Sequence, residues 1–516
     1  MVGACLACLS VGAAAWSPAA GAAAGGGNSS HPNIVVVLTD DQALSQVGSR
    51  FLPNITKLIK RRGTNFPNAY LTTPLCCPSR ATLLTGEYGH NNGVLTNRYG
   101  LLRHKSNVLP AWLQRAGYVT AHVGKFLNLY HRFTDPAAVA PGWDQWYTEL
   151  DRSEDDYYSW DQSVNGKIVH HGQRDSDYAP RVFQRQAMHV VSRFVPRRKP
   201  LYLELDEIAP HAGHGRTATG CTGSAVPAPG DVGKFSDVQL PRPPSFNEAN
   251  MSDKPSFLQD QPPLTADQIA QRTRAYQCGL GALQSVDRTV ARLVDEFRSL
   301  GELGETVFIF YTDNGLFYGE HRLVGGKLYP YEEADKTPLY IRLPARYRAG
   351  SARVPTVSEA VANIDFAPTI LRLAGGSPCV SRSNCRVMDG RSLVPLLRGQ
   401  IPAWSTNRPI GVELRLDRGA HPGVCQYTGV RVPGAVYVQH QEIADTATGQ
   451  CVPDDEQERY DLNTDPFELN NLCTGGGPCP TDATQIELEG LLARISRCAG
   501  IRGRDPRPPG GRGYCG

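Results

Sequence analysis

The sequence predicts an α/β fold in which helices cover both faces of a large mixed, mostly parallel sheet, followed by a smaller C-terminal α+β subdomain. Residues 33–38 and 306–311 are short, mainly apolar runs rich in β-branched and aromatic side chains, a pattern typical of buried parallel strands. Residues 265–300, just before the second run, repeat apolar side chains at helical spacing. Strands that alternate with helices favour a sheet sandwiched between helices.

Local patterns predict the remaining elements. We expect a helix over 108–116 that leads into a strand over 118–123. Residues 212–263 are rich in Gly, Pro and Ser and lack periodicity, so we expect a long surface insertion near the functional site. In the last part of the chain we expect short strands over 409–416 and 435–439 and a closing helix near 485–498.

A chain of 516 residues has room for a large domain and a smaller one. We divide it into a signal-like leader (1–30), a main domain (31–400) and a disulfide-rich subdomain with a basic Pro/Gly tail (401–516). The leader has the apolar, small-residue character of a secretory signal, although the usual Lys/Arg start is missing. We therefore expect a secreted, periplasmic or cell-surface protein; a disordered leader or lipid attachment at Cys5 or Cys8 is the alternative. No later run is apolar enough for a transmembrane segment.

Charge and cysteine content limit the partners and the compartment. The net charge of +3 and the absence of a long basic run give no support for nucleic-acid binding. Fourteen cysteines fit an oxidising compartment. The close pairs Cys379/Cys385 and Cys473/Cys479 predict small disulfide loops, whereas Cys221 and Cys278 stand alone and the other pairings stay open. Structural zinc is the weaker alternative, because beyond the leader no C-x-x-C pair occurs.

Both buried runs end in acidic turns. Asp40 and Asp41 follow the first run, and Asp313 and Asn314 follow the second. An isolated turn of this kind is usually an ordinary loop. Ligands of open α/β sheets bind beyond the carboxyl ends of the strands, so we expect the two turns to face one crevice.

Residues 76–86 read Cys-Cys-Pro-Ser-Arg-Ala-Thr-Leu-Leu-Thr-Gly, an ordered match to C-x-P-S-R-x-x-L-L-T-G. This segment resembles the signature of the formylglycine-dependent sulfatases, which have an alkaline-phosphatase-like fold. The resemblance implies that Cys76 is oxidised to formylglycine (3-oxoalanine) by a formylglycine-generating enzyme during maturation, and that residues 31–400 form the catalytic domain. A buried thiol or half of a disulfide is the alternative for Cys76.

The resemblance also implies a metal site. The two acidic turns match the protein ligands of one Ca²⁺ per chain, with the modified residue 76 completing the set. An all-oxygen shell rich in carboxylates suits a hard cation, Ca²⁺ before Mg²⁺. The expected ligands are Asp40, Asp41, Cys76, Asp313 and Asn314.

Four further basic residues match catalytic elements of these sulfatases. Arg80 would hold the nucleophile, Lys125 and Lys327 would contact the sulfate, and His211 would face the leaving oxygen. Cations there stabilise the charge that develops as the S–O bond breaks. Many sulfatases have His two residues after the first lysine; here Asn128, three residues after it, is a candidate polar substitute that contacts the substrate.

Residues 124–128, 142–147, 163–167 and 363–371 are similar to one branch of the family, the N-acetylglucosamine-6-sulfatases and their extracellular heparan endosulfatase relatives. The resemblance implies a sulfuric ester hydrolase acting on sulfated sugars, through a formylglycine diol and a sulfated enzyme. The alternatives are a broad arylsulfatase, a phosphonate or phosphodiester hydrolase on the same scaffold, or an inactive sulfated-glycan-binding protein with unmodified Cys76.

Two further features have competing interpretations. A dense aromatic stretch either stacks on sugar faces or packs in the core, and His321 either lies near the site or only packs. The aromatic stretch consists of Trp143, Trp146, Tyr147, Tyr157, Tyr158 and Trp160.

Overall fold

The computed structural model describes Met1 and residues 31–150, 156–197, 199–213, 220–419, 423–445 and 448–515. The predicted leader therefore lies almost entirely outside the described residues, as do Cys5 and Cys8. Among the residues that are described, no helix combines the length and the hydropathy that a membrane crossing needs.

The main sheet has nine strands within the described residues, and its five central strands run parallel. Antiparallel strands flank this parallel centre on both sides. The expected runs 33–38 and 306–311 lie next to each other as β1 and β9. In spatial order the strands are β2 (Thr64–Asn65), β10 (Tyr340–Arg342), β9 (Thr306–Thr312), β1 (Asn33–Thr39), β8 (Leu201–Asp206), β4 (Val119–Gly124), β5 (Gln145–Glu149), β6 (Trp160–Val164) and β7 (Lys167–His171).

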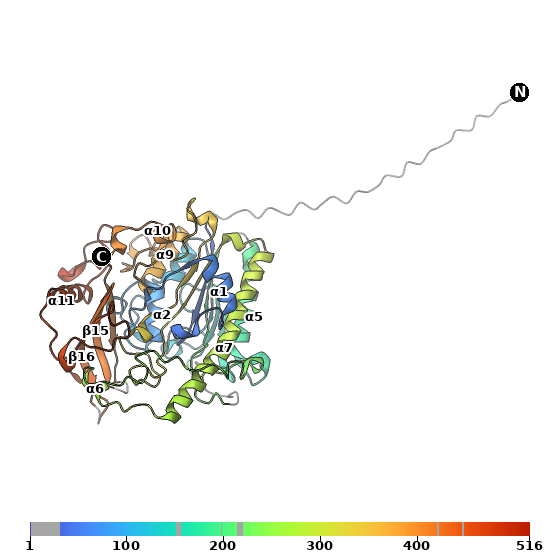
Figure 1. Cartoon of the computed structure of the whole chain (residues 1–516). Coiled ribbons are helices and arrows are strands. Elements are labelled where there is room, and N and C mark those ends of the chain that lie inside the picture. The colour runs from blue at the N-terminus through green and yellow to red at the C-terminus, as the bar shows by residue number, and fades with distance from the viewer. Residues whose placement is uncertain are drawn as a thin grey trace.

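Helices cover both faces of this sheet (Figure 1), so the predicted fold class is confirmed. One face carries α1 (Pro53–Leu58), α5 (Ala179–Phe194) and α7 (Ala266–Ser299). The other carries α2 (Cys76–Thr85), α4 (Leu109–Arg115), α9 (Phe366–Ala374) and α10 (Val394–Leu397). Each layer buries its own apolar core against the strands.

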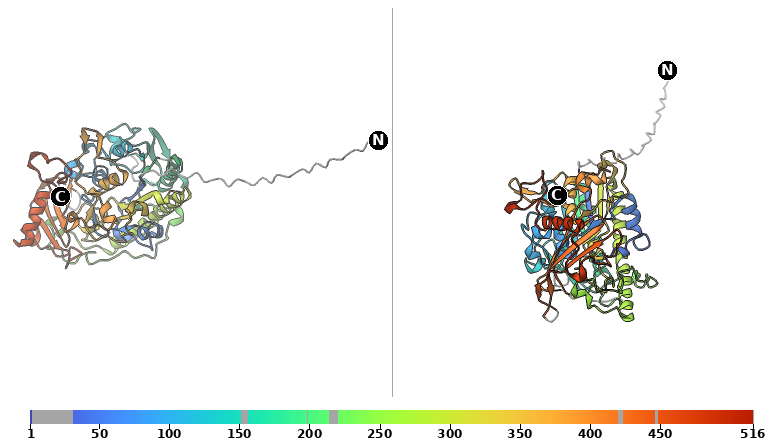
Figure 2. Two further views of the ribbon diagram at one scale, coloured as in Figure 1. Left: turned by 90° about the horizontal axis from the view of Figure 1, so that it is seen from above. Right: turned by 60° about the vertical axis from the view of Figure 1, so that its left-hand side comes forward.

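The C-terminal part forms a second, smaller sheet that packs beside the main one (Figure 2). The expected strand over 409–416 is β14, which has 6 residues. The expected strand over 435–439 is longer than predicted, because β16 has 10 residues and pairs along most of its length with β15, a strand of 9 residues that was not predicted. The elements are β14 (Ile410–Arg415), β15 (Val424–Val432), β16 (Ala435–Ala444), β17 (Cys451–Pro453), β18 (Gln457–Asp461) and α11 (Ala483–Ile495).

The remaining short elements lie in the connections. Two pairs of strands, β3 with β11 and β12 with β13, form separate two-stranded ladders. The elements are β3 (Ala69–Tyr70), β11 (Val361–Ala362), β12 (Cys379–Ser381), β13 (Asn384–Cys385), α3 (Gly89–Asn92), α6 (Ser256–Gln259) and α8 (Glu332–Asp335).

Residues 212–263 are not the simple surface insertion that the sequence predicts. Phe235, Val238 and Leu240 are buried in a small apolar cluster with Tyr276 and Leu280 of α7. Cys221 and Cys278, which stand alone in the sequence, form a disulfide that fastens this segment to the same helix. The segment is irregular yet packed, which Gly/Pro-rich composition alone does not reveal.

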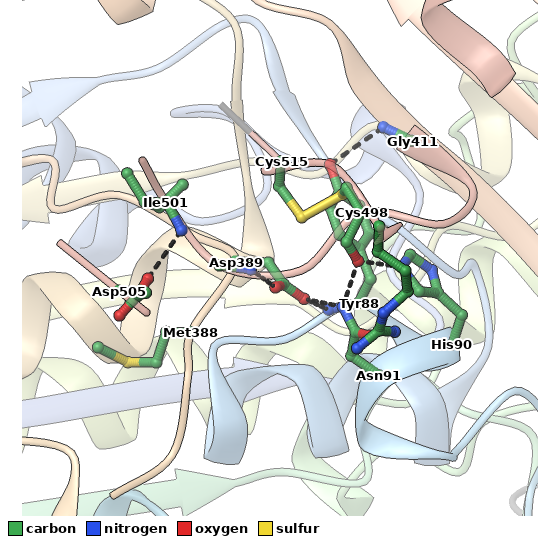
Figure 3. The surroundings of a disulfide bond; sticks show 12 residues. Tyr88, His90, Asn91, Met388, Asp389, Gly411, Cys498, Ile501, Asp505 and Cys515 are labelled. Carbon is green, nitrogen blue, oxygen red and sulfur yellow. Dashed lines mark hydrogen bonds between the residues drawn. A yellow bond between two sulfur atoms is a disulfide. The ribbon is translucent and has the colours of Figure 1, made fainter. Parts of the chain in front are cut away.

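Four further disulfides join cysteines of the described chain. The predicted loops Cys379–Cys385 and Cys473–Cys479 are confirmed. The other two bonds are Cys425–Cys451 and Cys498–Cys515. The last of these holds the C-terminal segment against Tyr88, His90 and Asn91 around α3 (Figure 3).

Candidate active site

The two acidic turns meet because β1 and β9 are parallel neighbours. Thr39 pairs with Thr312, so Asp40–Asp41 and Asp313–Asn314 leave the sheet side by side at its carboxyl edge. The backbone N–H of Asp41 donates to Oδ1 of Asp313 at 3.3 Å, and Nδ2 of Asn314 donates to Oδ1 of Asp41 at 2.6 Å. The predicted crevice is thus formed.

Cys76 is the first residue of α2 and points into this crevice from the opposite face of the sheet to α7. Its Sγ lies 3.6 Å from Oδ1 of Asp40 and 3.0 Å from Nζ of Lys327. Burial and the charge of Asp40 raise the pKa of the Cys76 thiol well above its usual value. The unmodified thiol therefore stays protonated at neutral pH, a poor nucleophile.

The carboxylate and amide oxygens around Cys76 fit a hard metal ion. Ligand atoms of Asp40, Asp41, Cys76 and His211 all lie within 4.8 Å of one another. Oδ1 of Asn314 is buried and has no hydrogen-bond partner among the described residues, which leaves an amide oxygen available at the same place. Burial and the charge of Asp40 raise the pKa of Asp313 to about 7. A divalent cation would offset this crowding of carboxylates.

Arg80 contacts the carboxylates of the crevice and connects them to the carboxyl ends of the strands. Its guanidinium contacts Asp313 at 2.9 Å, Asp40 at 3.3 Å and Asp206 at 3.1 Å, and it also donates to the backbone carbonyl of Lys125 at 2.8 Å. These carboxylates hold the pKa of Arg80 above its usual value although burial opposes it. Arg80 is thus a fully charged, fully engaged side chain.

Asp206 was not identified from the sequence as a residue of this site, although it forms an ion pair with Arg80. It is the last residue of β8, which lies between β1 and β4. Its position repeats the pattern of Asp40 and Asp313, an acid at the carboxyl end of a buried run, and that repeat was the signal available in the sequence.

Three further basic side chains surround the crevice. Lys125, directly after β4, contacts Oδ2 of Asp40 at 2.6 Å. Lys327 forms an ion pair with Asp41, and Nε2 of His211 lies 3.5 Å from Oδ2 of Asp41. Burial opposes the charge on Asp40, yet Lys125, His211, Arg80 and Lys327 hold its pKa well below the usual value.

The structure therefore brings nine of the ten predicted site residues into one contact network. Asn128 lies three residues beyond Lys125 and is half-buried, and its backbone carbonyl accepts a hydrogen bond from Tyr99 at 2.9 Å. Its proposed contact with the substrate remains a prediction.

The two open interpretations are resolved in favour of packing. All six residues of the aromatic stretch are buried, so none is available to stack on a sugar. His321 is buried as well, donates from Nδ1 to Oε2 of Glu248 at 2.7 Å and stacks on Tyr331.

The Sulfatase family model matches residues 32–377. The chain belongs to the sulfatase family. Membership implies a formylglycine in place of the motif cysteine and a metal ion beside it.

Two curated relatives and one solved structure show how far the similarity extends. N-acetylglucosamine-6-sulfatase of Capra hircus is 32% identical over 512 residues, 92% of this chain and 85% of the relative. The extracellular sulfatase SULF-1 homolog of Drosophila melanogaster is 33% identical over 385 residues, 73% of this chain. This sulfatase spans only 32% of that relative's length. The structure of BT4656 in complex with its substrate D-glucosamine-2-N,6-O-disulfate has a TM-score of 0.69 at 26% identity and covers 90% of this chain and 97% of its own.

Proposed function

We propose that this sulfatase hydrolyses sulfate esters of sulfated sugars resembling N-acetylglucosamine-6-sulfate, with formylglycine at position 76 as the nucleophile. The observation that carries the proposal is the position of Sγ of Cys76, which has Nζ of Lys327 at 3.0 Å on one side and Oδ1 of Asp40 at 3.6 Å on another. An oxygen attached to that carbon would face cations suited to a sulfate and carboxylates suited to a metal. The relatives named for 6-sulfated glucosamines support the sugar class.

In the first half of the reaction, one hydroxyl of the hydrated aldehyde loses its proton to solvent and its oxygen attacks the sulfur. The bond between sulfur and the sugar oxygen breaks, and that oxygen takes a proton from Nε2 of His211. Nδ1 of His211 lies 2.7 Å from the carbonyl of Ala212 and donates to it, so Nε2 carries a proton only in the imidazolium. Nε2 lies 3.5 Å from Oδ2 of Asp41.

In the second half, the remaining hydroxyl of residue 76 gives its proton to the neutral His211. The aldehyde C=O forms again and the C–O bond to sulfate breaks, which releases sulfate; water then hydrates the aldehyde. No water has to attack sulfur. Lys125, Lys327 and Arg80 stabilise the negative charge near the reacting atoms throughout.

We further propose that the metal is Ca²⁺, one per chain, held by Asp40, Asp41, Asp313, Asn314 and the oxygen of residue 76. These are oxygen donors, which Ca²⁺ prefers. When bound, the ion would lower the pKa of the neighbouring hydroxyl and neutralise the carboxylates. The free Oδ1 of Asn314 supports this ligand set.

Export and maturation by a formylglycine-generating enzyme belong to the same proposal. Five disulfides among the described residues suit an oxidising compartment. The extracellular relatives support the same location.

Mass spectrometry of the tryptic peptide that ends at Arg80 tests the proposal. In natively produced protein we expect the peptide to be lighter by the mass difference between a CH₂SH and a CHO group at Cys76, and Cys76→Ala to abolish turnover of N-acetylglucosamine-6-sulfate. An unmodified thiol in active protein would overturn the mechanism. Faster turnover of an aryl phosphodiester than of any sulfate ester would favour the phosphodiester hydrolase, and tight binding of sulfated glycan without turnover would favour the binding protein.

A further inference from the structure

A second strongly basic region lies at the opposite end of the main sheet from Cys76. Strand β10 runs antiparallel to β9, and its last residue, Arg342, pairs with Phe308 near the start of β9. Asp313, by contrast, follows the end of β9. Five residues of extended chain separate Phe308 from Asp313, a distance of roughly 17 Å. The basic region is therefore distinct from the crevice around Cys76.

The region is a hollow of about 520 Å³. Five arginines line it and no Asp or Glu does, so its lining carries more positive charge than the whole chain, whose net charge is +3. Leu303 and Leu343 contribute apolar side chains to its lining. The five arginines, called here the arginine hollow, are Arg61, Arg62, Arg342, Arg348 and Arg353.

Backbone contacts orient several of these guanidinium groups. Nη1 of Arg342 donates to the carbonyl of Leu58 at 3.2 Å, and Nη1 of Arg353 donates to the carbonyl of Gly63 at 2.9 Å. Nε of Arg348 is buried and has no hydrogen-bond partner among the described residues. A fixed guanidinium with unused N–H groups is prepared for an anion, because little side-chain freedom is lost on binding.

Nearby acidic residues are engaged elsewhere. Asp295 pairs with Arg298, one helical turn away on α7. Glu305 contacts Arg346 at 2.8 Å and accepts from the hydroxyl of Tyr347 at 2.7 Å. Glu302 accepts from Asn33 at 3.3 Å. The positive charge of the hollow is therefore not neutralised within the described chain.

Like charges held together raise the free energy of the empty hollow. Burial lowers the pKa of Arg342, and the charges of Arg298 and Arg62 lower it further. An anion would remove this repulsion and gain paired N–H···O hydrogen bonds, since the arginine fork matches two oxygens of one sulfate.

We propose that the arginine hollow is a second binding site for a sulfated glycan chain, which holds a polymeric substrate away from the catalytic crevice. This inference deepens the proposed function and takes its ligand class from it. Five arginines spread around one hollow suit several sulfates along a chain better than a single ion. A polymer bound there raises the local concentration of its other sulfated residues near Cys76.

Binding of a size-defined heparin oligosaccharide to the Cys76→Ala protein tests the site without hydrolysis. The test variant replaces three exposed arginines of the hollow, Arg61→Gln, Arg62→Gln and Arg353→Gln. The matched control removes the same charge from other exposed positions, Arg193→Gln, Arg274→Gln and Arg497→Gln. Calorimetry at two salt concentrations should show about tenfold weaker binding and a smaller salt dependence for the test variant alone.

Kinetics of the enzyme with intact Cys76 give the second measurement. The test variant should keep the wild-type rate on a monosaccharide sulfate and lose several-fold in kcat/KM on the sulfated polymer. Equal losses in the test and control variants would overturn the proposal, and so would single-stranded DNA that binds the hollow as tightly as heparin does. If no sulfate ester is hydrolysed but the hollow still binds heparin, the proposed function fails and the binding site stands.

Discussion

Arg80 shows how a single side chain organises this site. A buried cation is costly unless it is fully paired, and Arg80 meets carboxylates from three strands: Asp40 after β1, Asp313 after β9 and Asp206 on β8. Two of these are proposed metal ligands, and the third is not. The carboxylate of Asp206 therefore acts on the reaction by orienting Arg80.

Replacing Asp206 by Asn should lower kcat about tenfold to a hundredfold with a smaller change in KM, because a small displacement of Arg80 misplaces the reacting groups. Steady-state kinetics on N-acetylglucosamine-6-sulfate measure both constants. Asp231→Asn is the matched control: Asp231 pairs with Arg288 at 2.6 Å on the α7 face, so it should lower stability and leave kcat unchanged. Wild-type kcat in Asp206→Asn would contradict a positioning role.

At this scale the sequence was informative where residues form a contiguous motif. Cys76 and Arg80 share one segment, and Asp40 and Asp313 each follow a recognisable strand. Asp206 was missed because its importance lies in a contact with Arg80 that is 126 residues away in the chain. The aromatic stretch was ambiguous for a related reason, since a ring in the sequence does not reveal which side of the sheet it faces.

At the scale of elements, the site depends on how closely β4 and β8 approach each other. Gly124 ends β4 with φ at +112°, and a Cβ atom there would lie 1.9 Å from the carbonyl oxygen of Asp206. Only glycine permits both the conformation and the contact. Lys125 comes directly after Gly124, so the close contact between β4 and β8 determines where the ammonium group and the backbone carbonyl of Lys125 lie.

Gly124→Ala should therefore destabilise the fold by several kcal/mol and abolish most activity, because β4 and β8 must separate. Gly117→Ala separates backbone strain from the steric contact. Gly117 also has a positive φ, +89°, but a Cβ atom there meets no atom within 4 Å. The substitution should cost only about 1 kcal/mol of backbone strain and keep full activity. Chemical denaturation and turnover of both variants check this; equal losses would show that the contact with Asp206 is unimportant.

Elements with a clear period were predicted well, and irregular ones were not. Strands β1 and β9 and helix α7 have strong apolar patterns and were placed within one or two residues of their ends. In residues 212–263 the buried side chains Phe235, Val238 and Leu240 follow no period, so composition suggested an exposed loop. The Cys221–Cys278 bond was equally hidden, because sequence gives no distance between the two cysteines.

At the scale of the whole molecule, His90 joins three separate parts of the chain. It follows α2, and its Nδ1 contacts Glu413 of the C-terminal sheet at 2.9 Å. Its Nε2 lies 3.0 Å from the carbonyl of Cys498 (Figure 3). Burial alone would lower the pKa of His90, but Glu413 outweighs it and raises the pKa to about 9. The protonated imidazole thus fastens the C-terminal segment.

This pKa predicts a pH-dependent stability. Unfolded histidine titrates near pH 6.5, so the contribution of His90 is complete below about pH 6.5 and is lost as the pH rises through 9. His90→Gln should therefore lower the free energy of unfolding by up to about 3 kcal/mol at pH 6, with a smaller difference from wild type at pH 9.

Denaturant unfolding at both pH values measures the effect. The control, His170→Gln, removes an exposed His–Asp pair with 65% of the imidazole accessible, and solvent screening should leave its stability close to wild type at both pH values. A loss for His90→Gln that does not change between pH 6 and pH 9 would show that packing, not protonation, is responsible.

The burial of Cys76 sets an order of events in the life of the chain. Its side chain is 1% exposed and is covered by Lys327, which is synthesised 251 residues later. If residue 76 is the nucleophile, as we propose, an oxidising enzyme must reach that sulfur while the polypeptide is still open, before the fold closes. We then expect protein that folds with an unmodified Cys76 to stay inactive when it later meets the oxidising enzyme.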